Sequence, residues 1–390
     1  MQSPGVLVIH NRYQQPAGED AAVRAEVDLL RSAGHRVVQY TRDNSDLTHY
    51  SSRQKGALLF TTTWSRRTYD DIRRLIRQER PDIAHCHNFL PLVSPSALYA
   101  CRSEGIPVVQ TLHNYRLLCP AATLFANGRR CERCPCRALS AARRRCYRNS
   151  WPQTATVSLM LAAHRLARTW TRCVDAYIAP SRFCRDYFVL AGLPEQKVHV
   201  KPNFLARDPG QRSGQGGYAL FVGRLSPEKG ALEMLEAWSQ LPEVSLRVIG
   251  DGPLYFAAQR LACHRGDVRM LGQMSTERTL AHIRSARFLV FPSRWYEPFG
   301  MGLLEAAACG VPAIASRIGA IPELVIEGRT GLLFDPDNFD DFAQRIRWAW
   351  THPREMHEMG RAARQLYLQR FTAERNYRIL MDIYGSLLAN

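Results

Sequence analysis

Two stretches in the second half of the chain combine charged side chains with glycines in patterns suited to a phosphorylated ligand. The first, at residues 223–230, reads Gly-Arg-Leu-Ser-Pro-Glu-Lys-Gly and places Arg224 and Lys229 five residues apart. An arginine offers a planar fork of donors and a lysine a compact charge, so together they can neutralise a diphosphate leaving group without a metal. Taken alone, this stretch is equally well explained as an exposed basic turn.

The second stretch follows the apolar run at 288–291 and carries two glutamates eight residues apart, Glu297 and Glu305. Gly300 and Gly302 would leave the first amides of a following helix open to phosphate oxygens. Glu305 is flanked by leucines and alanines, and a carboxylate in so apolar a helix needs a polar partner. The spacing separates the two carboxylates along a ligand, so one would bind sugar hydroxyls and the other a ribose.

A third feature is a cluster of cysteines in the first half of the chain. The spacing Cys-x11-Cys-x2-Cys-x11-Cys is similar to two arms of a tetrahedral thiolate site. Asn127 and Gly128 predict a tight hairpin between the first two of these cysteines. A structural zinc, free thiols, and a redox or disulfide role all remain open on this pattern. The candidate ligands are Cys119, Cys131, Cys134 and Cys146, with Cys136 as an extra thiol.

Short apolar runs alternate with helical patterns along the chain, which predicts parallel α/β sheets. Ligands of such sheets bind beyond the carboxyl ends of the strands, where the charged loops above lie. In the first half we expect strands at 6–10, 37–40, 81–87, 107–112 and 175–180, and helices at 23–33, 97–102 and 158–173. In the second half we expect strands at 218–222, 245–249, 268–271, 288–291 and 312–315, and helices at 230–238, 277–285 and 300–308.

The length of 390 residues favours two domains, and the composition is that of an ordinary globular protein. The glycine- and proline-rich segment 204–217 predicts a linker. The domains are then an α/β domain at 1–203 with a Cys/Arg-rich insertion at about 116–150, a second α/β domain at 218–371, and a C-terminal helix at 372–390 that could pack back across the cleft.

The charge is unevenly distributed. Residues 1–205 carry a net charge of +15 and residues 206–390 only +2. A basic first domain favours contact with an anionic surface such as phospholipid headgroups, a polyprenyl pyrophosphate or nucleic acid, although a solvated arginine-rich surface is the plain alternative. No apolar run is long enough to span a bilayer and no secretory signal precedes the first strand, so we expect a cytoplasmic protein with reduced thiols.

Four motifs in sequence order give the chain a family resemblance. They are Gly223-Arg224-Leu-x3-Lys229-Gly230, Val-Ile-Gly-Asp-Gly-Pro at 248–253, Glu297-x7-Glu305, and Gly-Ala-Ile-Pro-Glu-Leu-Val-x2-Gly-x2-Gly at 319–331. Together they resemble the retaining glycosyltransferases of family 4 (glycosyl transferases group 1), and the resemblance covers nearly the whole chain. Segments 16–20, 34–37, 82–88 and 111–114 look like the acceptor domain of that family.

The resemblance implies a GT-B fold, in which two Rossmann-like domains face one another across a cleft. The nucleotide-sugar would bind to the second domain and the acceptor to the first. The residues implied in catalysis are His113, Arg224, Lys229 and Glu297. The residues implied in donor binding are Gly18, Arg224, Lys229, Gly272, Met274, Glu297, Phe299, Gly300, Met301 and Glu305, with the last on the ribose. The family commonly has paired glycines where this chain has Ala17 and Gly18.

The implied reaction moves a sugar from a UDP- or GDP-sugar to a saccharide with retention of configuration and needs no metal. The basic first domain favours a lipid-linked acceptor, such as a polyprenyl pyrophosphate, in cell-surface polysaccharide or lipopolysaccharide assembly. The enzyme would then be peripheral on the inner face of the cytoplasmic membrane. Some family members share the cysteine segment. We expect this segment, with Arg143–Arg145 among its arginines, to form a metal-pinned flap near the acceptor cleft that touches anionic lipid or the pyrophosphate of the acceptor.

Three other functions fit part of the sequence. A nucleotide-sugar epimerase or hydrolase would use the same architecture. A catalytically idle binding subunit would keep the fold, although the full set of charged residues argues against it. A nucleic-acid-binding protein with a zinc module would explain the charge and the cysteines, but the two carboxylates of the second domain would repel a polyanion, so we expect no nucleic-acid partner.

Overall fold

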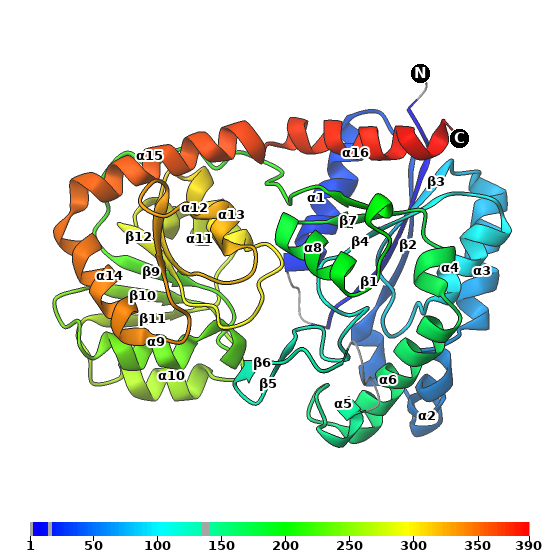
Figure 1. The fold of residues 1–390 in the computed structure, drawn as a ribbon, viewed down its shortest axis with the longest axis horizontal. Coiled ribbons are helices and arrows are strands. Elements are labelled where there is room, and N and C mark those ends of the chain that lie inside the picture. The colour runs from blue at the N-terminus through cyan, green and yellow to red at the C-terminus, as the bar shows by residue number, and fades with distance from the viewer. Residues whose placement is uncertain (1–2, 15–17, 135–139, 390) are drawn as a thin grey trace. The chain divides into compact units, whose positions relative to one another are not determined.

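The computed structural model describes residues 3–14, 18–134 and 140–389. The chain forms two compact units (Figure 1). The first unit consists of residues 1–124, 131–206 and 373–390, and the second of residues 125–130 and 207–372. No helix in the described part of the chain combines the length and the apolar character needed to cross a membrane.

The first unit is built on a six-stranded parallel sheet with the strand order β2-β1-β3-β4-β7-β8. The order places β1 beside both β2 and β3, with Val6 opposite Val37 and Ile83. Its strands are β1 (Val6–Arg12), β2 (Val37–Asp43), β3 (Ile83–Asn88), β4 (Val108–Thr111), β7 (Ala176–Ala179) and β8 (Val198–Val200).

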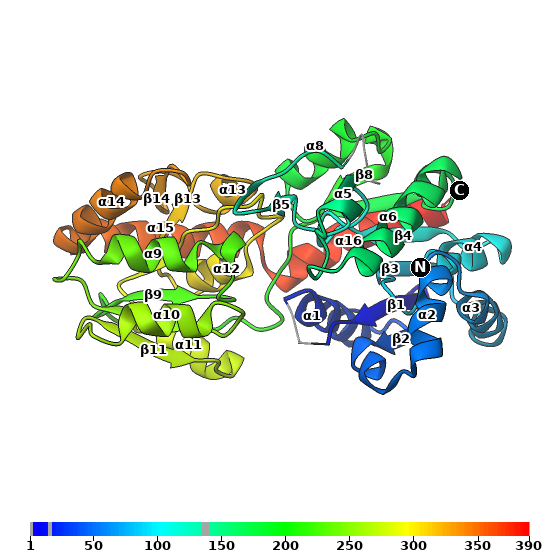
Figure 2. The same ribbon diagram turned by 90° about the horizontal axis from the view of Figure 1, so that it is seen from below.

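Helices flank this sheet (Figures 1 and 2). Alternate residues of β1, β3, β4 and β7 form one apolar core with the buried faces of α1 and α16. The helices of the unit are α1 (Gly18–Ser32), α2 (Ser52–Thr61), α3 (Arg66–Glu79), α4 (Ser96–Ser103), α5 (Ser140–Arg143), α6 (Trp151–Leu166), α7 (Thr169–Arg172), α8 (Arg182–Leu190) and α16 (Ala373–Leu388), with 3-10 turns at Asn44–His49 and Glu195–Lys197.

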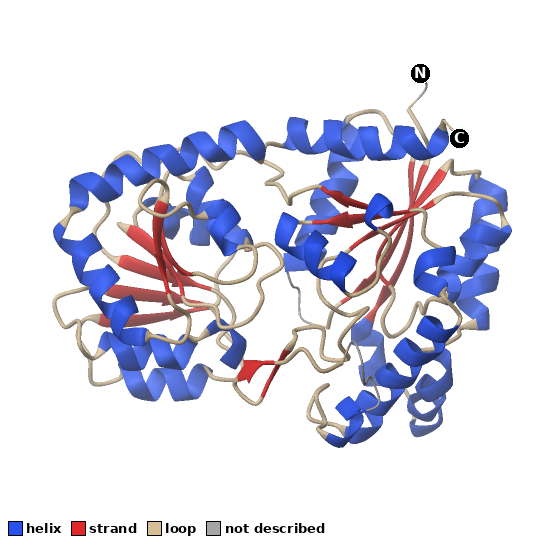
Figure 3. Cartoon of the chain, viewed as in Figure 1, coloured by secondary structure: helices blue, strands red, loops and turns tan. Residues whose placement is uncertain are grey.

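The second unit has its own six-stranded parallel sheet, with the order β11-β10-β9-β12-β13-β14 (Figure 3). The strands are β9 (Ala219–Val222), β10 (Leu246–Ile249), β11 (Val268–Gly272), β12 (Phe288–Phe291), β13 (Ala313–Ser316) and β14 (Gly331–Phe334). The helices are α9 (Ala231–Trp238), α10 (Tyr255–Ala262), α11 (Thr276–Arg284), α12 (Met301–Ala308), α13 (Ile321–Leu324), α14 (Phe339–Thr351) and α15 (Pro353–Arg370), with a 3-10 turn at Pro227–Lys229.

The predicted fold class is confirmed, because both sheets are parallel and six-stranded with helical connections. The predicted single helix at 158–173 is wrong. The chain forms α6 and then the short α7, because Arg168 adopts a left-handed backbone with φ of 54° that ends the first helix. Leu159 and Leu166, two apolar side chains of α6, are exposed.

The structure describes both the predicted hairpin and the predicted linker. The predicted hairpin at Asn127 and Gly128 is confirmed, since it joins β5 (Phe125–Ala126) to the antiparallel β6 (Arg129–Arg130). The predicted linker contains neither helix nor strand, but it is not a free spacer. Arg212 is buried there and donates from Nη1 to the carbonyl oxygens of Ala286 and Arg287, at 3.0 and 3.1 Å.

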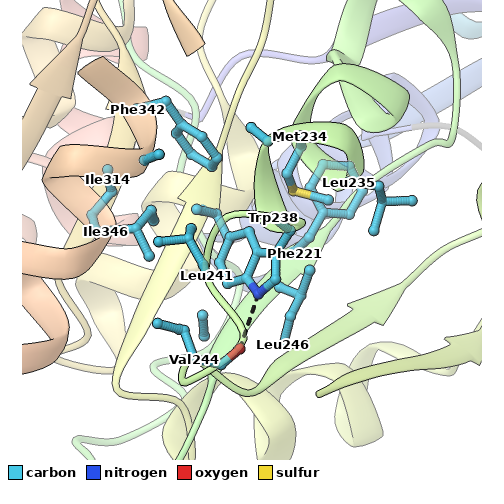
Figure 4. Packing of buried hydrophobic residues seen from close by; sticks show 14 of the residues in the cluster. Phe221, Met234, Leu235, Trp238, Leu241, Val244, Leu246, Ile314, Phe342 and Ile346 are labelled. Atoms are coloured by element: carbon cyan, nitrogen blue, oxygen red, sulfur yellow. Dashed lines mark hydrogen bonds between the residues drawn. The ribbon is translucent and has the colours of Figure 1, made fainter. Parts of the chain in front are cut away.

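The core of the second unit is centred on Trp238 (Figure 4). Its indole is fully buried among Phe221, Met234 and Phe342, and its Nε1 donates to the carbonyl oxygen of Val244 at 2.9 Å. This ring therefore ties α9 to the turn that precedes β10 and to α14.

Replacing this indole should destabilise the second unit. We expect Trp238→Ala to lower its free energy of unfolding by about 3–5 kcal/mol, because the change leaves a cavity and an unpaired carbonyl. Urea unfolding followed by circular dichroism would measure the loss. The matched control is Trp348→Ala on the surface of α14, where we expect a loss under about 1 kcal/mol. Equal losses in the two variants would contradict this account of the core.

Candidate active site

The strand order of the second sheet reverses direction at its centre, between β9 and β12. From β9 the chain builds outward through β10 and β11 on one side, and β12 then starts the other side next to β9. Loops that follow two such neighbouring strands diverge, and ligands of open α/β sheets bind there. The loops after β9 and β12 are the two charged stretches that the sequence singled out.

Lys229 and Glu297, predicted separately, are joined by an ion pair. The Nζ of Lys229 lies 3.0 Å from Oε1 and 2.8 Å from Oε2 of Glu297. The carboxylate is buried and also accepts hydrogen bonds from Ser293 Oγ at 3.0 Å and Trp295 Nε1 at 2.7 Å. The ammonium lies over the rings of Phe291 and Trp295. A buried carboxylate with three donors is held in one position.

A glycine of the fourth motif fixes the backbone of Glu297. Gly319 has a φ of +58°, and a β-carbon there would lie 2.6 Å from the backbone nitrogen of Glu297. The next residue, Ala320, donates its N–H to the carbonyl oxygen of Glu297 at 2.9 Å. The loop that carries Gly319 therefore acts as a support for the carboxylate, and any side chain at this position would displace it.

Arg224 lies on the loop after β9 and is exposed. A second glycine positions this loop, because a β-carbon on Gly250 would lie 1.9 Å from the carbonyl oxygen of Gly223. The N–H of Leu225 donates to the carbonyl oxygen of Asp251 at 2.9 Å. Among the described residues the guanidinium of Arg224 has no ion-pair partner, so the structure leaves it available to an anion.

Glu305 stands just over one turn inside α12, which begins at Met301. It is half-buried, and burial raises the pKa of its carboxyl group to about 7. Phe299 precedes the helix, is buried, and packs edge-to-face on Phe371 with ring centroids 5.9 Å apart. Gly300 forms the N-terminal cap of α12 with a φ of +110°. These residues follow β12, as expected, at the same sheet edge as Lys229.

Gly272 and Met274 lie at the end of β11, on the outer side of β10. The carbonyl oxygen of Gly272 accepts the N–H of Gly250 at 2.9 Å. This bond links the predicted donor-binding residue Gly272 to the glycine that supports the Arg224 loop. Met274 itself is half-buried.

The remaining predicted residues belong to the first unit. Gly18 begins α1, while Ala17 lies outside the described residues. His113 follows β4, and its Nε2 lies 2.9 Å from Nδ1 of His87, so one ring donates to the other. Burial lowers the pKa of His113 to about 3, so its imidazole is neutral.

Behind His113 lies a buried polar network that the sequence did not reveal. Its centre is Glu26 on α1, whose Oε2 lies 2.6 Å from the Nζ of Lys201. The other oxygen, Oε1, lies 3.0 Å from Nδ1 of His85 and 3.4 Å from Nε2 of His87. His87 therefore connects Glu26 to His113. A helix glutamate at the spacing of buried apolar residues is the only sequence signal that would have indicated this role.

The C-terminal helix completes the network. Asn376 of α16 accepts a hydrogen bond from Lys201 Nζ at 3.0 Å. The hydroxyl group of Tyr384, also on α16, lies 2.7 Å from Nδ1 of His85. The helix predicted at 372–390 thus supplies polar contacts as well as apolar ones to the first unit.

The network is charge-balanced by the protein itself. Burial alone would raise the pKa of Glu26, but the Lys201 ammonium and His85 outweigh it and hold the pKa well below its ordinary value. Ligand atoms of Glu26, His85 and His87 lie within 4.8 Å of one another, which is the geometry of a metal site. An ammonium 2.6 Å from the carboxylate already balances its charge without a metal ion, however.

Sequence reasoning also missed Glu19, next to Gly18. Its Oε2 accepts hydrogen bonds from the hydroxyl group of Tyr13 and from Nδ2 of Asn114, each at 3.0 Å. Burial raises the pKa of Glu19 to about 8. This carboxyl group is therefore largely protonated at pH 7, beside the residue that follows His113 in the chain.

The structure gathers the four predicted zinc ligands without closing a site. The thiols of Cys119 and Cys134 are buried and hydrogen-bonded to one another. Cys131 and Cys146 are half-buried and interact electrostatically with them. Within the described ranges, no three of these four sulfur atoms all lie within 4.8 Å of one another. Cys136 lies outside the described residues.

The neutral histidines make stability depend on pH. Burial holds the pKa of His87 well below its ordinary value and that of His113 at about 3, so both take up protons only when the chain unfolds. Their stabilising effect is complete above about pH 6.5 and is lost as the pH falls, by roughly 1.4 kcal/mol for each at pH 5.5.

We therefore expect the melting temperature to fall between pH 7.5 and 5.5, and His87→Asn to reduce that fall. Scanning calorimetry of both proteins across this range would measure the two slopes. Other titrating groups are common to both proteins, so the difference in slope isolates His87. Identical slopes would show that His87 is not neutral in the folded chain.

Comparison with known proteins places this geometry in a family. The model of Glycosyltransferase Family 4 matches residues 22–208, and that of Glycosyl transferases group 1 matches residues 205–366. D-rhamnosyltransferase WbpZ of Pseudomonas aeruginosa is 38% identical over 160 residues. That match covers 40% of this chain and 42% of WbpZ, so it spans less than half the length of the relative.

Solved structures agree on the fold. Sucrose-phosphate synthase of Thermosynechococcus elongatus is similar over 99% of both chains, with a TM-score of 0.75 and 18% identity. Anabaena Alr3699/HepE in complex with UDP-glucose is similar over 98% of this chain and 100% of that chain, with a TM-score of 0.68 and 18% identity. Because the two matching family models together span residues 22–366, the chain belongs to the group 1 glycosyltransferases, with the GT-B fold.

Proposed function

We propose that the protein transfers a sugar from a nucleoside-diphosphate sugar, with UDP or GDP as the nucleotide, to a saccharide acceptor with retention of configuration. The observation that carries the proposal is the Lys229–Glu297 ion pair beside the exposed Arg224, where the strand order reverses between β9 and β12. A relative named as a D-rhamnosyltransferase and a structural neighbour that binds UDP-glucose support the donor class.

Each charged group has a distinct role in this proposal. Arg224 and Lys229 bind the donor diphosphate and stabilise the charge that develops as it leaves. Glu297 binds hydroxyl groups of the transferred sugar, and its hydrogen-bond donors keep the carboxylate oriented. Glu305 accepts hydrogen bonds from the ribose, and Phe299, Gly300 and Met301 contribute backbone amides. Because Lys229 already contacts Glu297, donor binding would share the ammonium between carboxylate and phosphate.

The proposed reaction needs no covalent intermediate on the enzyme. The bond between the anomeric carbon and the diphosphate oxygen breaks, and the acceptor oxygen forms its bond on the same face. The acceptor proton passes to the departing diphosphate. The neutral His113 contacts the substrate saccharide as a hydrogen-bonding group. It is a poor general acid, because an imidazole with a pKa of about 3 is unprotonated at pH 7.

The transferase proposal predicts specific losses. We expect Lys229→Met and Glu297→Gln to lower kcat/KM for the donor by about 10²–10³, since each removes a charge aimed at the reacting groups. The assay measures nucleoside diphosphate release from UDP- and GDP-sugars with and without a membrane lipid extract. Glu358→Gln on the exposed face of α15 is the matched control and should leave the rate unchanged.

The products distinguish the alternatives. A transferase releases nucleoside diphosphate in an acceptor-dependent way, whereas a hydrolase needs no acceptor and an epimerase releases no nucleotide. The anomeric configuration of the product, read by NMR, tests retention. Turnover that is unaffected by Lys229→Met would contradict the proposed site, and failure of every nucleotide-sugar to bind would favour the idle binding subunit.

We further propose a lipid-linked acceptor, such as a polyprenyl-pyrophosphate saccharide of cell-surface polysaccharide assembly. The support is the net charge of +15 over residues 1–205, which suits an anionic lipid surface. On this proposal the enzyme works at the inner face of the cytoplasmic membrane, and the first unit binds the acceptor.

A structural zinc held by Cys119, Cys131, Cys134 and Cys146 is also proposed. Four thiols are the full ligand set of a tetrahedral structural site, and two of them already share a buried hydrogen bond. The metal would supply cross-linking of the 116–150 segment and would take no part in sugar transfer. The four thiols suit zinc as ligand types, and their sulfur atoms must move closer together to bind one ion.

We expect the purified protein to contain about one zinc ion per chain by elemental mass spectrometry. Cys119→Ser and Cys134→Ser should lose the metal and lower the melting temperature. Cys263→Ser, which removes an exposed thiol of the second unit, should retain both. Zinc content no higher than that of the serine variants would refute the site.

A further inference from the structure

Helix α2 of the first unit contributes no residue to a hydrophobic core. None of the ten residues of α2 is buried. The helix nevertheless carries the consecutive apolar residues Leu58, Leu59 and Phe60, and Phe60 is 76% exposed. Its N-terminus is stabilised locally by a capping box between Ser51 and Gln54. A local cap stabilises the helix but does not account for the apolar residues at its other end.

A second helix, α6, is apolar on both sides. Its inner face packs in the first unit through Val157, Met160 and Leu161. A second apolar stripe runs along its outer face at helical spacing through Trp151, Leu159, Ala162 and Leu166. The ends of this stripe, Trp151 and Leu166, are 55% and 88% exposed. A helix that is apolar all round is normally covered on all sides.

The two helices lie together. They pack against one another in the structure. Six of the twelve exposed large apolar side chains in the described part of the chain belong to α2, α6 and the turn after α2. They are Leu59, Phe60, Trp64, Trp151, Leu159 and Leu166. Scattered apolar residues on a surface need no explanation, but this share on two adjacent helices indicates a docking surface.

The two segments of the chain that carry these helices are basic. Residues 47–69, which include α2, contain four basic and no acidic residues. Residues 140–174, which include α6, contain seven arginines and no acidic residue. Exposed apolar side chains framed by arginine and lysine are the signature of a surface that lies in the headgroup region of an anionic bilayer.

We propose that α2 and α6 form a membrane-docking face that inserts its apolar side chains among the headgroups of anionic phospholipids. The face lies flat in the interface, with Phe60, Trp151 and Leu166 in the acyl boundary and the arginines at the phosphates. This inference rests on the proposed lipid-linked acceptor for its purpose. The binding itself follows from the exposed residues and the charge, which a nucleic acid would match only in part because it offers no apolar phase.

The test uses the full-length protein and vesicles of phosphatidylcholine with or without 30% phosphatidylglycerol. Co-sedimentation should show binding to the anionic vesicles that weakens with salt. The double variant Phe60→Ser/Leu166→Ser should lower the partition coefficient at least tenfold. The matched control, Phe256→Ser/Leu190→Ser, removes residues of the same type that are 74% and 88% exposed elsewhere, and should change it less than twofold.

Three outcomes would overturn the proposal. The first is equal vesicle binding by the double variant and the wild type, and the second is an equal loss of binding in the control variant. The third is binding to RNA or heparin that competes fully with vesicles and has the same affinity in the double variant as in the wild type. Circular dichroism of each variant checks that it is folded, since none of the four residues is in a core.

Donor turnover measured without vesicles separates this inference from the proposed function. Vesicle binding with no turnover of any nucleotide-sugar would refute the transferase and leave the docking face standing. Normal turnover of a soluble donor by a protein that does not bind anionic vesicles would do the reverse.

Discussion

The first unit depends on a carboxylate and an ammonium that are buried together. A buried charge without a partner is strongly destabilising, so neither Glu26 nor Lys201 can be buried alone. Folding of the first unit therefore requires α1 and the segment after β8 to come together. The histidines of β3 and two polar residues of α16 complete the coordination of this pair. The position of His113 follows from it, because His113 is held by His87, which in turn faces Glu26.

The second unit uses the same chemical solution for a different purpose. Glu297 is as buried as Glu26 and is also paired with a lysine, but Lys229 remains partly accessible at a sheet edge. An ion pair closed on all sides stabilises a fold, whereas one open on the side of the cation can accept a second anion. Gly319 and Gly250 contact the backbone of Glu297 and of Gly223, and these contacts fix the two loops that carry the open ion pair.

The parts of the site that follow neighbouring strands were predictable, because spacing alone assigns Arg224, Lys229, Glu297 and Glu305 to the segments that follow two strands at one sheet edge. Glu26 was not predictable, since a lone glutamate on a helix usually faces solvent and its lysine lies 175 residues further along the chain. The exposure of the outer stripe of α6 was not predictable for a related reason. Helical spacing identifies an apolar face but does not say whether protein covers it, and here only one of the two faces is covered.

The discontinuity of the first unit has a consequence for how the chain is made. After residue 206 the chain builds all of the second unit except residues 125–130, and it returns to the first unit only at residue 373. Leu380, Ile383 and Tyr384, which close the apolar core over β1 and β3, therefore emerge from the ribosome only after residues 207–372 of the second unit. During synthesis the second unit can fold as soon as it is extruded, while the first must wait with an open core. A nascent chain thus has the strands of the second unit in place before the polar network behind His113 can form.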